Sequence, residues 1–499
     1  MMFDAIWSLQ TLKWLLIASV PVWIIADGLY SLFWHPLRKY PGPWYCAVSR
    51  LPIAYKNASG RYYKWADGLH KKYGPVVRTS PSDLSFTNPE AWNDIFSHRP
   101  QLAKTPFAYP PASADLPDTI MTAGDAYHAR LRRSVAAGFS YKAMDEVEPI
   151  IQGRIDEMVA ALRHDCSQGS QNVRQWITWT ITDIIGDLAL STDFECIKER
   201  RHHPWTAAIF PNLKGIMLLN QLRRLGLSTP VGALLSTNAA KRARDKIRLF
   251  TVDHVQARLA RERTEEGKQT KDLLGMIVRD PENQKDPLSD PEIAALSLTL
   301  VIAGSETTTT ALAGMMYYLT KSPRVLKKLT EEIRTAFPTA ADITTKNAVK
   351  LRYLNGAVEE ALRLFIPAPS LPPRIVPKSG HKIGGEWIPG GTGVTIANYH
   401  NSHSDEFFDN ASDFRPERWI DGGEGSHTKR HVKNAYSAFS AGPRNCVGKT
   451  LALTEMRLLT AKLLWHFDME LDGPHDGWLE TARFYVSTSC LLRFPLATR

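Results

Sequence analysis

One cysteine stands in a setting that favours a reactive thiolate. Cys446 follows Gly442 and Arg444, is followed by Gly448, and lies just before a predicted helix over residues 449–466. The free N–H groups and the dipole at such a helix start stabilise an anion, and glycines let backbone approach a flat ligand closely. A thiolate held there can ligate haem iron and promote cleavage of O–O bonds. Arg444 could pair with a carboxylate of the cofactor.

A long helix is predicted upstream of this loop. Ser289 and Glu292 have the spacing of a capping box, and Pro291 suits the first turn of a helix. An apolar helical pattern then runs to about Lys321, where Ser322 and a following proline stop it.

The middle of this helix, residues 303–310 (AGSETTTT), combines poor helix formers with a charge. A polar stripe on a surface helix would explain it, but the flanks LTLVIA and ALAGMMYYL are apolar on nearly all sides and indicate burial. Inconsistent local sequence inside a buried element is where functional sites are expected. We expect a break near Ala303 and Gly304 that leaves room for a small ligand. Glu306 and Thr307 could relay protons there.

A further acid has two arginines within reach if the fold unites them. Glu360 and Arg363 share one face of a helix predicted over residues 355–365, and Arg418 follows a proline-bounded loop. An ordinary surface pair would explain the first two residues. A glutamate between two arginines would instead form a structural cluster.

Basic residues elsewhere could serve a cofactor's carboxylates. His128 and Arg132 are four residues apart on a predicted helix, and Arg374 follows two prolines. Each taken alone is explained by a surface charge. Together with Arg444 they could hold two carboxylates.

The loop from Phe439 to Gly448 matches the signature F-x-x-G-x-R-x-C-x-G of cytochromes P-450 at every fixed position. AGSETT resembles the oxygen-activating motif of that family, Glu360 and Arg363 match E-x-x-R, and PERW around Arg418 resembles the element that completes the triad. The chain therefore resembles a cytochrome P-450 over nearly its whole length. LFWHPLRKYPGP and HARLRRSVAAGFS are similar to microsomal members from filamentous fungi.

The resemblance implies haem b as cofactor, Cys446 as axial ligand of the iron, and Glu306 and Thr307 as catalytic residues. Glu360, Arg363 and Arg418 would be the structural triad. Further residues are expected to bind the cofactor: His128, Arg132, Ala303, Gly304, Arg374, Phe439, Gly442, Arg444 and Gly448. Two residues depart from the commonest pattern, since Glu306 stands where Asp is usual and His128 where many members have Trp.

The implied reaction uses O2 and electrons from NADPH, delivered by a separate NADPH–cytochrome P-450 reductase, with cytochrome b5 as an optional second donor. Cations near the expected proximal elements in sequence could steer an acidic reductase, although charges that serve solubility alone would look the same. These cations are Arg130, Arg133, Lys429, Arg430, Lys433 and Lys449.

The substrate is expected to be a hydrophobic small molecule, a fungal secondary metabolite of polyketide, terpenoid or alkaloid type. Four largely apolar segments are expected over the distal pocket, although a core or membrane-facing role would explain them nearly as well. They are Pro106–Pro117, Trp205–Leu235, Ser370–Pro372 and Tyr485–Thr488. Oxidative phenol coupling or oxidative ring formation would need the same oxidant and stays open. A reductase-independent isomerase or dehydratase fits less well, because such enzymes tend to lack the acid–alcohol pair.

The resemblance implies a mainly α fold with a smaller β region, a triangular helical domain around haem. The chain has 499 residues, 43% of them hydrophobic, and no linker divides it, so one large domain is expected over residues 45–499. The net charge of +10 comes with no nucleic-acid motif. Five widely spaced cysteines argue against disulfide, zinc and iron–sulfur frameworks and fit a reducing compartment.

The N-terminus is expected to be a membrane anchor. Residues 5–26 carry one charge, Lys13, and can just span a bilayer. Arg38 and Lys39 follow, which favours a cytosolic catalytic domain. A cleaved signal peptide fits less well, because the chain opens with Met-Met-Phe-Asp and lacks a basic start. We therefore predict an anchor over residues 1–30, a proline-rich hinge over 31–44, and the endoplasmic reticulum membrane as location.

Overall fold

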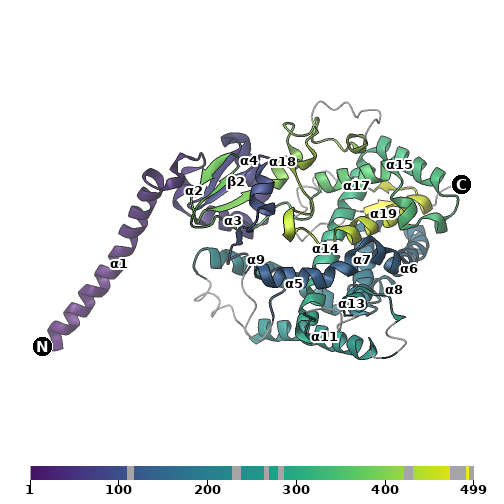
Figure 1. The fold of residues 1–499 in the computed structure, drawn as a ribbon, viewed down its shortest axis with the longest axis horizontal. Helices are drawn as coiled ribbons and strands as arrows, with labels where there is room; N and C mark the ends of the chain where they lie inside the picture. The colour runs from purple at the N-terminus through teal and green to yellow at the C-terminus, as the bar shows by residue number, and fades with distance from the viewer. Residues whose placement is uncertain are drawn as a thin grey trace. The chain divides into compact units, whose positions relative to one another are not determined.

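The structure is a computed structural model that describes residues 2–109, 117–227, 238–262, 264, 269–278, 286–420, 431–472 and 491–493. The chain divides into two compact units. The sheet unit comprises residues 1–108, 217–231 and 370–400, and the helical unit comprises the remainder. Most of the described residues are helical, and the strands are few and short, as the resemblance implied (Figure 1).

The sheet unit contains a five-stranded sheet in the order β1–β2–β8–β5–β3. Its strands are β1 (Val76–Ser80), β2 (Asp83–Phe86), β8 (Gly393–Ile396), β5 (Arg374–Ile375) and β3 (Ala103–Lys104). β2 pairs in parallel with β8, and the other neighbours are antiparallel. Every residue of β2 and β8 is buried, so both faces of the sheet centre are covered.

Short elements complete this unit. A hairpin joins β6 (His381–Ile383) to β7 (Glu386–Ile388). The helices are α1 (Met2–Phe33), α2 (Trp44–Val48), α3 (Leu51–Ala58) and α4 (Tyr62–Tyr73), with a 3-10 turn at Pro36–Lys39 and a π-helical turn at Asn93–Ser97.

The end of α1 is fixed to the sheet by one arginine. The buried Arg78 of β1 donates to the Ser31 carbonyl oxygen and to its hydroxyl, both at 2.9 Å. The predicted hinge lies against the same strand: Arg78 N–H bonds the Pro41 carbonyl, and a Cβ on Gly42 would lie 2.4 Å from the Arg78 carbonyl oxygen. Only glycine therefore fits at Gly42.

The predicted membrane span is not supported. Over the part of the chain that the structure describes, no helix has both the length and the apolar character needed to cross a membrane.

The helical unit is built from helices of 4 to 32 residues around one large hydrophobic core and a smaller one. They are α5 (Asp125–Ala136), α6 (Tyr141–Asp165), α7 (Val173–Leu190), α8 (Cys196–Glu199), α11 (Asn238–Glu262), α13 (Leu273–Val278), α14 (Asp290–Lys321), α15 (Pro323–Ala336), α16 (Thr345–Ala348), α17 (Arg352–Leu364) and α19 (Lys449–His466). A three-stranded sheet has the order β4 (Gln171–Asn172), β10 (Leu491–Arg493), β9 (Glu470–Leu471). Two helices, α9 (Pro204–Arg224) and α18 (Asn398–His403), have residues in both units.

The predicted long helix is α14, and both of its predicted ends are confirmed. Ser289 is the N-cap, the capping box with Glu292 is formed, and the helix stops at Lys321. α14 packs along α7 so closely that a Cβ on Gly304 would lie 3.0 Å from Cδ1 of Ile185.

The expected break inside α14 is wrong, because the helix runs without interruption from Asp290 to Lys321. The hydroxyls supply the reason. Ser305 donates to the Val301 carbonyl at 2.8 Å and Thr307 to the Ala303 carbonyl at 2.5 Å. Such bonds one turn back let serine and threonine sit within a helix.

Candidate active site

The loop before α19 presents Cys446 to solvent. The Cys446 N–H donates to the Phe439 carbonyl at 2.9 Å, and the Asn445 N–H to the Gly442 carbonyl at 3.1 Å. Gly442 has φ +72°, which favours glycine. The loop therefore closes on itself, and Cys446 is exposed while its neighbours are half-buried.

Opposing influences act on the Cys446 thiol. Protein atoms crowd the sulfur, although solvent reaches it, and the resulting desolvation raises its pKa. The N–H of Gly448 and the charges of Arg132 and Lys449 oppose this rise without reversing it, so the pKa of the Cys446 thiol stays above its usual value. Gly448 is also the N-cap of α19, and a Cβ there would lie 3.9 Å from the Cys446 sulfur. The surroundings thus contain the cations and the helix start that favour a thiolate.

Two arginines predicted to bind cofactor carboxylates have protein partners. Arg444 donates to the Ala123 carbonyl at 2.8 Å and to the Asp125 carboxylate at 2.6 Å. Arg132 donates to the carbonyl and the side-chain oxygen of Asn445, at 2.5 and 2.7 Å. Both join α5 to the cysteine loop.

The other predicted cofactor residues are placed differently. His128 is buried in α5. Phe439 lies under the Lys449 ammonium, 5.6 Å from the ring centroid. Arg374 belongs to the sheet unit, where it is buried and its guanidinium lies 5.6 Å from the Phe96 ring centroid. Contact of these residues with a cofactor remains a prediction.

One row of residues along α14 is accessible to solvent. The residues Ala295, Thr299, Ala303 and Thr307 repeat at intervals of four and are exposed or half-buried. The Glu306 side chain is buried. Thr307 and Ala303 thus share an accessible stripe that could face a small ligand.

The Glu306 carboxylate is paired with an arginine that sequence reasoning missed. Arg174 of α7 donates to its Oε1 at 2.7 Å. Burial raises the pKa of Glu306, and Arg174 opposes that rise. A lone cation at the start of the apolar run VRQWITWTITDIIG was the available signal.

A second acid was also missed. Glu455 of α19 is buried, and desolvation raises its pKa to about 8. A hydrogen bond from the Thr308 hydroxyl of α14 opposes that rise. Its signal was a lone acid in the apolar run LALTEMRLL. Glu455 links the helix after the cysteine to the helix that carries Thr307.

The structure brings Glu360, Arg363 and Arg418 together in full burial. Arg363 forms a fork onto Glu360 at 2.8 and 2.9 Å, and Arg418 Nε donates at 2.9 Å. Trp419 Nε1, which sequence reasoning missed, donates at 2.8 Å, and the Arg415 N–H at 3.0 Å. These donors lower the pKa of Glu360 despite its burial.

The candidate reductase-facing cations that the structure describes divide into two groups. Arg130 forms ion pairs with Glu292 and Asp286. It is therefore not the free surface charge that the sequence led us to expect. Arg133, Lys433 and Lys449 are exposed. Lys429 and Arg430 lie outside the described residues.

The segments expected over a substrate pocket are described only in part. Residues 110–116, 228–235 and 485–488 lie outside the described residues. Pro106 and Phe107 line a cavity of about 130 Å³ within the sheet unit. That cavity also contains the buried ion pair of Arg224 with Asp83, so it is less apolar than expected.

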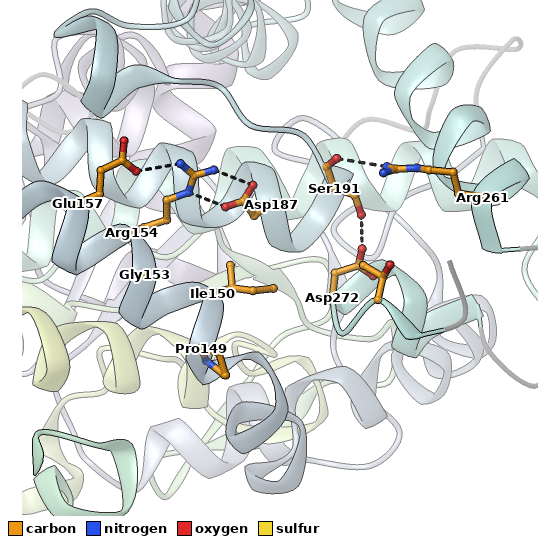
Figure 2. Close-up of a pocket in the computed structure, with 10 residues that line it drawn as sticks. Pro149, Ile150, Gly153, Arg154, Glu157, Asp187, Ser191, Arg261 and Asp272 are labelled. Carbon is orange, nitrogen blue, oxygen red and sulfur yellow. Dashed lines mark hydrogen bonds and ion pairs between the residues drawn. The ribbon is translucent and has the colours of Figure 1, made fainter. Parts of the chain in front are cut away.

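A larger cavity, about 490 Å³, lies elsewhere in the helical unit, lined by α6, α7, α11 and the segment before α13 (Figure 2). Its arginines and acids bind one another: Arg154 contacts Glu157 and Asp187, and Ser191 bonds Asp272. Neither the accessible face of α14 nor Cys446 lines it. This cavity is therefore distinct from the candidate active site.

The residues around Cys446 fit a haem. An accessible sulfur at a helix start is a donor for haem iron. Two arginines place positive charge near this sulfur. Arg444 is two residues from Cys446 in the chain, and Arg132 binds the neighbouring Asn445. The site therefore has the chemistry of a haem-thiolate protein.

Comparison with known proteins agrees. The chain matches the family model for cytochrome P-450 over residues 39–487. It is 37% identical over 473 residues to an averantin hydroxylase of Dothistroma septosporum, covering 94% of this chain and 88% of that protein. It is 38% identical over 462 residues to an averantin hydroxylase of Aspergillus parasiticus, covering 92% of each. It is 38% identical over 451 residues to the cytochrome P-450 monooxygenase stcF of Emericella nidulans, covering 90% of this chain and 92% of that protein.

The chain therefore belongs to the cytochrome P-450 family, whose cofactor is haem, and is a monooxygenase.

Proposed function

We propose that this chain inserts one oxygen atom from O2 into a hydrophobic small molecule of fungal secondary metabolism. The observation that carries the proposal is the accessible Cys446 sulfur on its closed loop at the start of α19. Two relatives that match over most of their length are named averantin hydroxylases, which supports hydroxylation and makes averantin the first substrate to test.

When bound, haem would supply the chemistry that activates O2. Cys446 would hold the iron by its sulfur, and Ala303 and Thr307 would border the space where oxygen reacts. The Thr307 hydroxyl now donates to the Ala303 carbonyl, so it must rotate to donate elsewhere. Glu306 would pass protons, and its raised pKa helps it to hold one.

The test uses the haem-loaded chain with NADPH, a fungal NADPH–cytochrome P-450 reductase, isotopically labelled O2 and averantin, followed by related aromatic compounds. A product that gains one labelled oxygen supports the proposal, and the Cys446→Ser variant should give none. A dimeric or cyclised product without labelled oxygen would favour the alternative, oxidative coupling or ring formation. NADPH-independent rearrangement of a substrate would contradict both.

We propose that a reductase binds the face around the cysteine loop. Exposed Arg133, Lys433 and Lys449 support a partner with an acidic surface. Reversing all three charges should slow reduction by NADPH and flatten its salt dependence, whereas Lys327→Glu on α15 should not. An unchanged rate and salt dependence would mean that the reductase does not bind here. Added cytochrome b5 would test the second donor.

We also propose that α1 attaches the chain to the endoplasmic reticulum membrane. Large apolar side chains on α1 are more than half exposed, among them Trp14, Val22 and Trp23. Such a surface is suited to lipid. Release of the full-length chain from membranes by alkaline carbonate would contradict stable anchoring.

A further inference from the structure

We propose that Arg132 is a positioning residue for the iron ligand and acts through Asn445: its guanidinium fixes the peptide group that precedes Cys446 and thereby sets the direction of the sulfur. This role is separate from any contact with the carboxylates of haem. It rests on the haem-thiolate chemistry of the site and is independent of the substrate.

The first support is the geometry of one peptide group. The peptide that joins Asn445 to Cys446 is held at both ends, because Arg132 donates to its carbonyl at 2.5 Å and its N–H donates to the Phe439 carbonyl at 2.9 Å. A peptide group is planar, so bonds at its two ends fix its orientation. The Cα of Cys446 lies in that plane.

The second support is the fork itself. Arg132 also donates to the Asn445 side-chain oxygen at 2.7 Å, so two nitrogens of one guanidinium bind one residue. A two-point contact fixes orientation as well as distance. A lysine would keep the charge but not the fork.

The third support is a reciprocal contact. Arg444, from the loop, reaches back to the Ala123 carbonyl and to Asp125 at the start of α5. Arg132 lies seven residues beyond Asp125, about 10 Å along the helix. The two residues before Cys446 are thus tied to α5 at two separate points.

The fourth support is that α5 is itself fixed. Arg130 and Tyr127 both bind Glu292, the capping-box residue at the start of α14. The element that holds the cysteine loop is therefore bound to the helix that carries Thr307. Arg132 acts from a rigid support.

The experiment compares haem-loaded full-length variants by their reduced, carbon-monoxide-bound spectra. We measure how fast the strongly red-shifted band of thiolate-ligated haem converts, under mild heating, to the band of haem that has lost its thiolate. We expect Arg132→Ala to accelerate the conversion about 10-fold, as for loss of a charged hydrogen bond, and Asn445→Ala to accelerate it less. The double variant should convert no faster than Arg132→Ala, because both changes remove one interaction.

Two further variants distinguish the geometry of the fork from the positive charge and from a general loss of hydrogen bonding. Arg132→Lys should convert nearly as fast as Arg132→Ala, and restoration of the wild-type rate by lysine would mean that charge alone matters. Asn355→Ala is the matched control, because Asn355 accepts from Arg457 of α19 at 2.8 Å, away from the loop, and its loss should leave the rate unchanged.

If Asn445→Ala converts at the wild-type rate, or if the double variant converts faster than Arg132→Ala by the full factor seen for Asn445→Ala, Arg132 does not act through Asn445 and the inference fails. Asn445 is half-buried and its replacement is mild, so this arm does not depend on the folding of the arginine variants. A wild-type chain without the thiolate band would instead refute the haem-thiolate assignment.

Discussion

Two buried glutamates in the helical unit differ in how completely their carboxylates are satisfied. Glu360 accepts hydrogen bonds from Arg363, Arg418, Trp419 and a backbone N–H, and its pKa is lowered. Glu306 is bound by Arg174 from one side, and burial raises its pKa. A carboxylate with every lone pair engaged is fixed as an anion, whereas one held from a single side can take up and release a proton. The first is suited to hold structure and the second to do chemistry.

The largest expected effect is at Glu360. Glu360→Gln leaves two buried guanidinium groups without a countercharge, which costs about 3–5 kcal/mol of unfolding free energy. Urea unfolding of the purified chain measures it. Glu331→Gln on α15 is the control, because that carboxylate is 64% exposed and its pair with Lys327 is 3.9 Å long. A loss of only about 1 kcal/mol would place Glu360 in the same class as a surface pair.

The next effect is on turnover at Glu306. Glu306→Gln cannot release a proton, so we expect NADPH-dependent turnover to fall about 100-fold, in the usual range for a lost acid–base group. Stopped-flow oxidation of NADPH in the presence of reductase measures it. The control Ser305→Ala removes a buried neighbour whose hydroxyl only bonds the Val301 carbonyl. Equal turnover in the glutamine variant would show that protons arrive by another route.

Removal of Arg174 should move the pH dependence without abolishing activity. Arg174 lowers the pKa of Glu306, so Arg174→Ala should raise that pKa further. The activity limb that reflects ionisation of Glu306 should therefore move to higher pH. A profile of turnover against pH tests this, and an unmoved limb would mean that the pair is only structural.

A more gradual effect, spread over the pH range between the unfolded and folded pKa values, is predicted at Glu455, where the raised pKa of about 8 links stability to pH. The folded chain holds this proton more tightly than the unfolded chain does. The stabilisation is therefore complete below the unfolded pKa, near 4.3, and is lost as pH rises towards 8. The slope is at most about 1.4 kcal/mol per pH unit.

Glu455→Gln keeps the shape and the neutral state, so this part of the pH dependence should disappear. Thermal unfolding of both chains between about pH 4 and about pH 9, a range that includes both pKa values, gives the comparison. Parallel curves for the two chains would mean that Glu455 is ionised in the folded state.

Local signals predicted the elements well. The capping box and prolines around α14 act within a few residues, so its ends could be read from Ser289 to Ser322. The amino-acid composition at the middle of α14 led to the wrong expectation of a break in the helix. Hydrogen bonds from the hydroxyls of Ser305 and Thr307 to carbonyls one turn back offset the low helix propensity of serine and threonine.

Partners far apart in the chain could not be read from spacing. Glu306 and Arg174 are separated by 132 positions, and Arg132 and Asn445 by 313. Arginines near the cysteine suggested carboxylates of a cofactor, but a guanidinium satisfies a protein carbonyl equally well. Which acceptor it reaches depends on how α5 packs against the loop, and that follows from the whole fold.

The central claim is that the Cys446 sulfur is the iron ligand. The direct measurement is the difference spectrum of the reduced, haem-loaded chain with and without carbon monoxide, for wild type and Cys446→Ser. We predict the strongly red-shifted band of thiolate-ligated haem in wild type and its loss in the variant. A band typical of histidine ligation in well-folded wild type, or the same red-shifted band in Cys446→Ser, would contradict it.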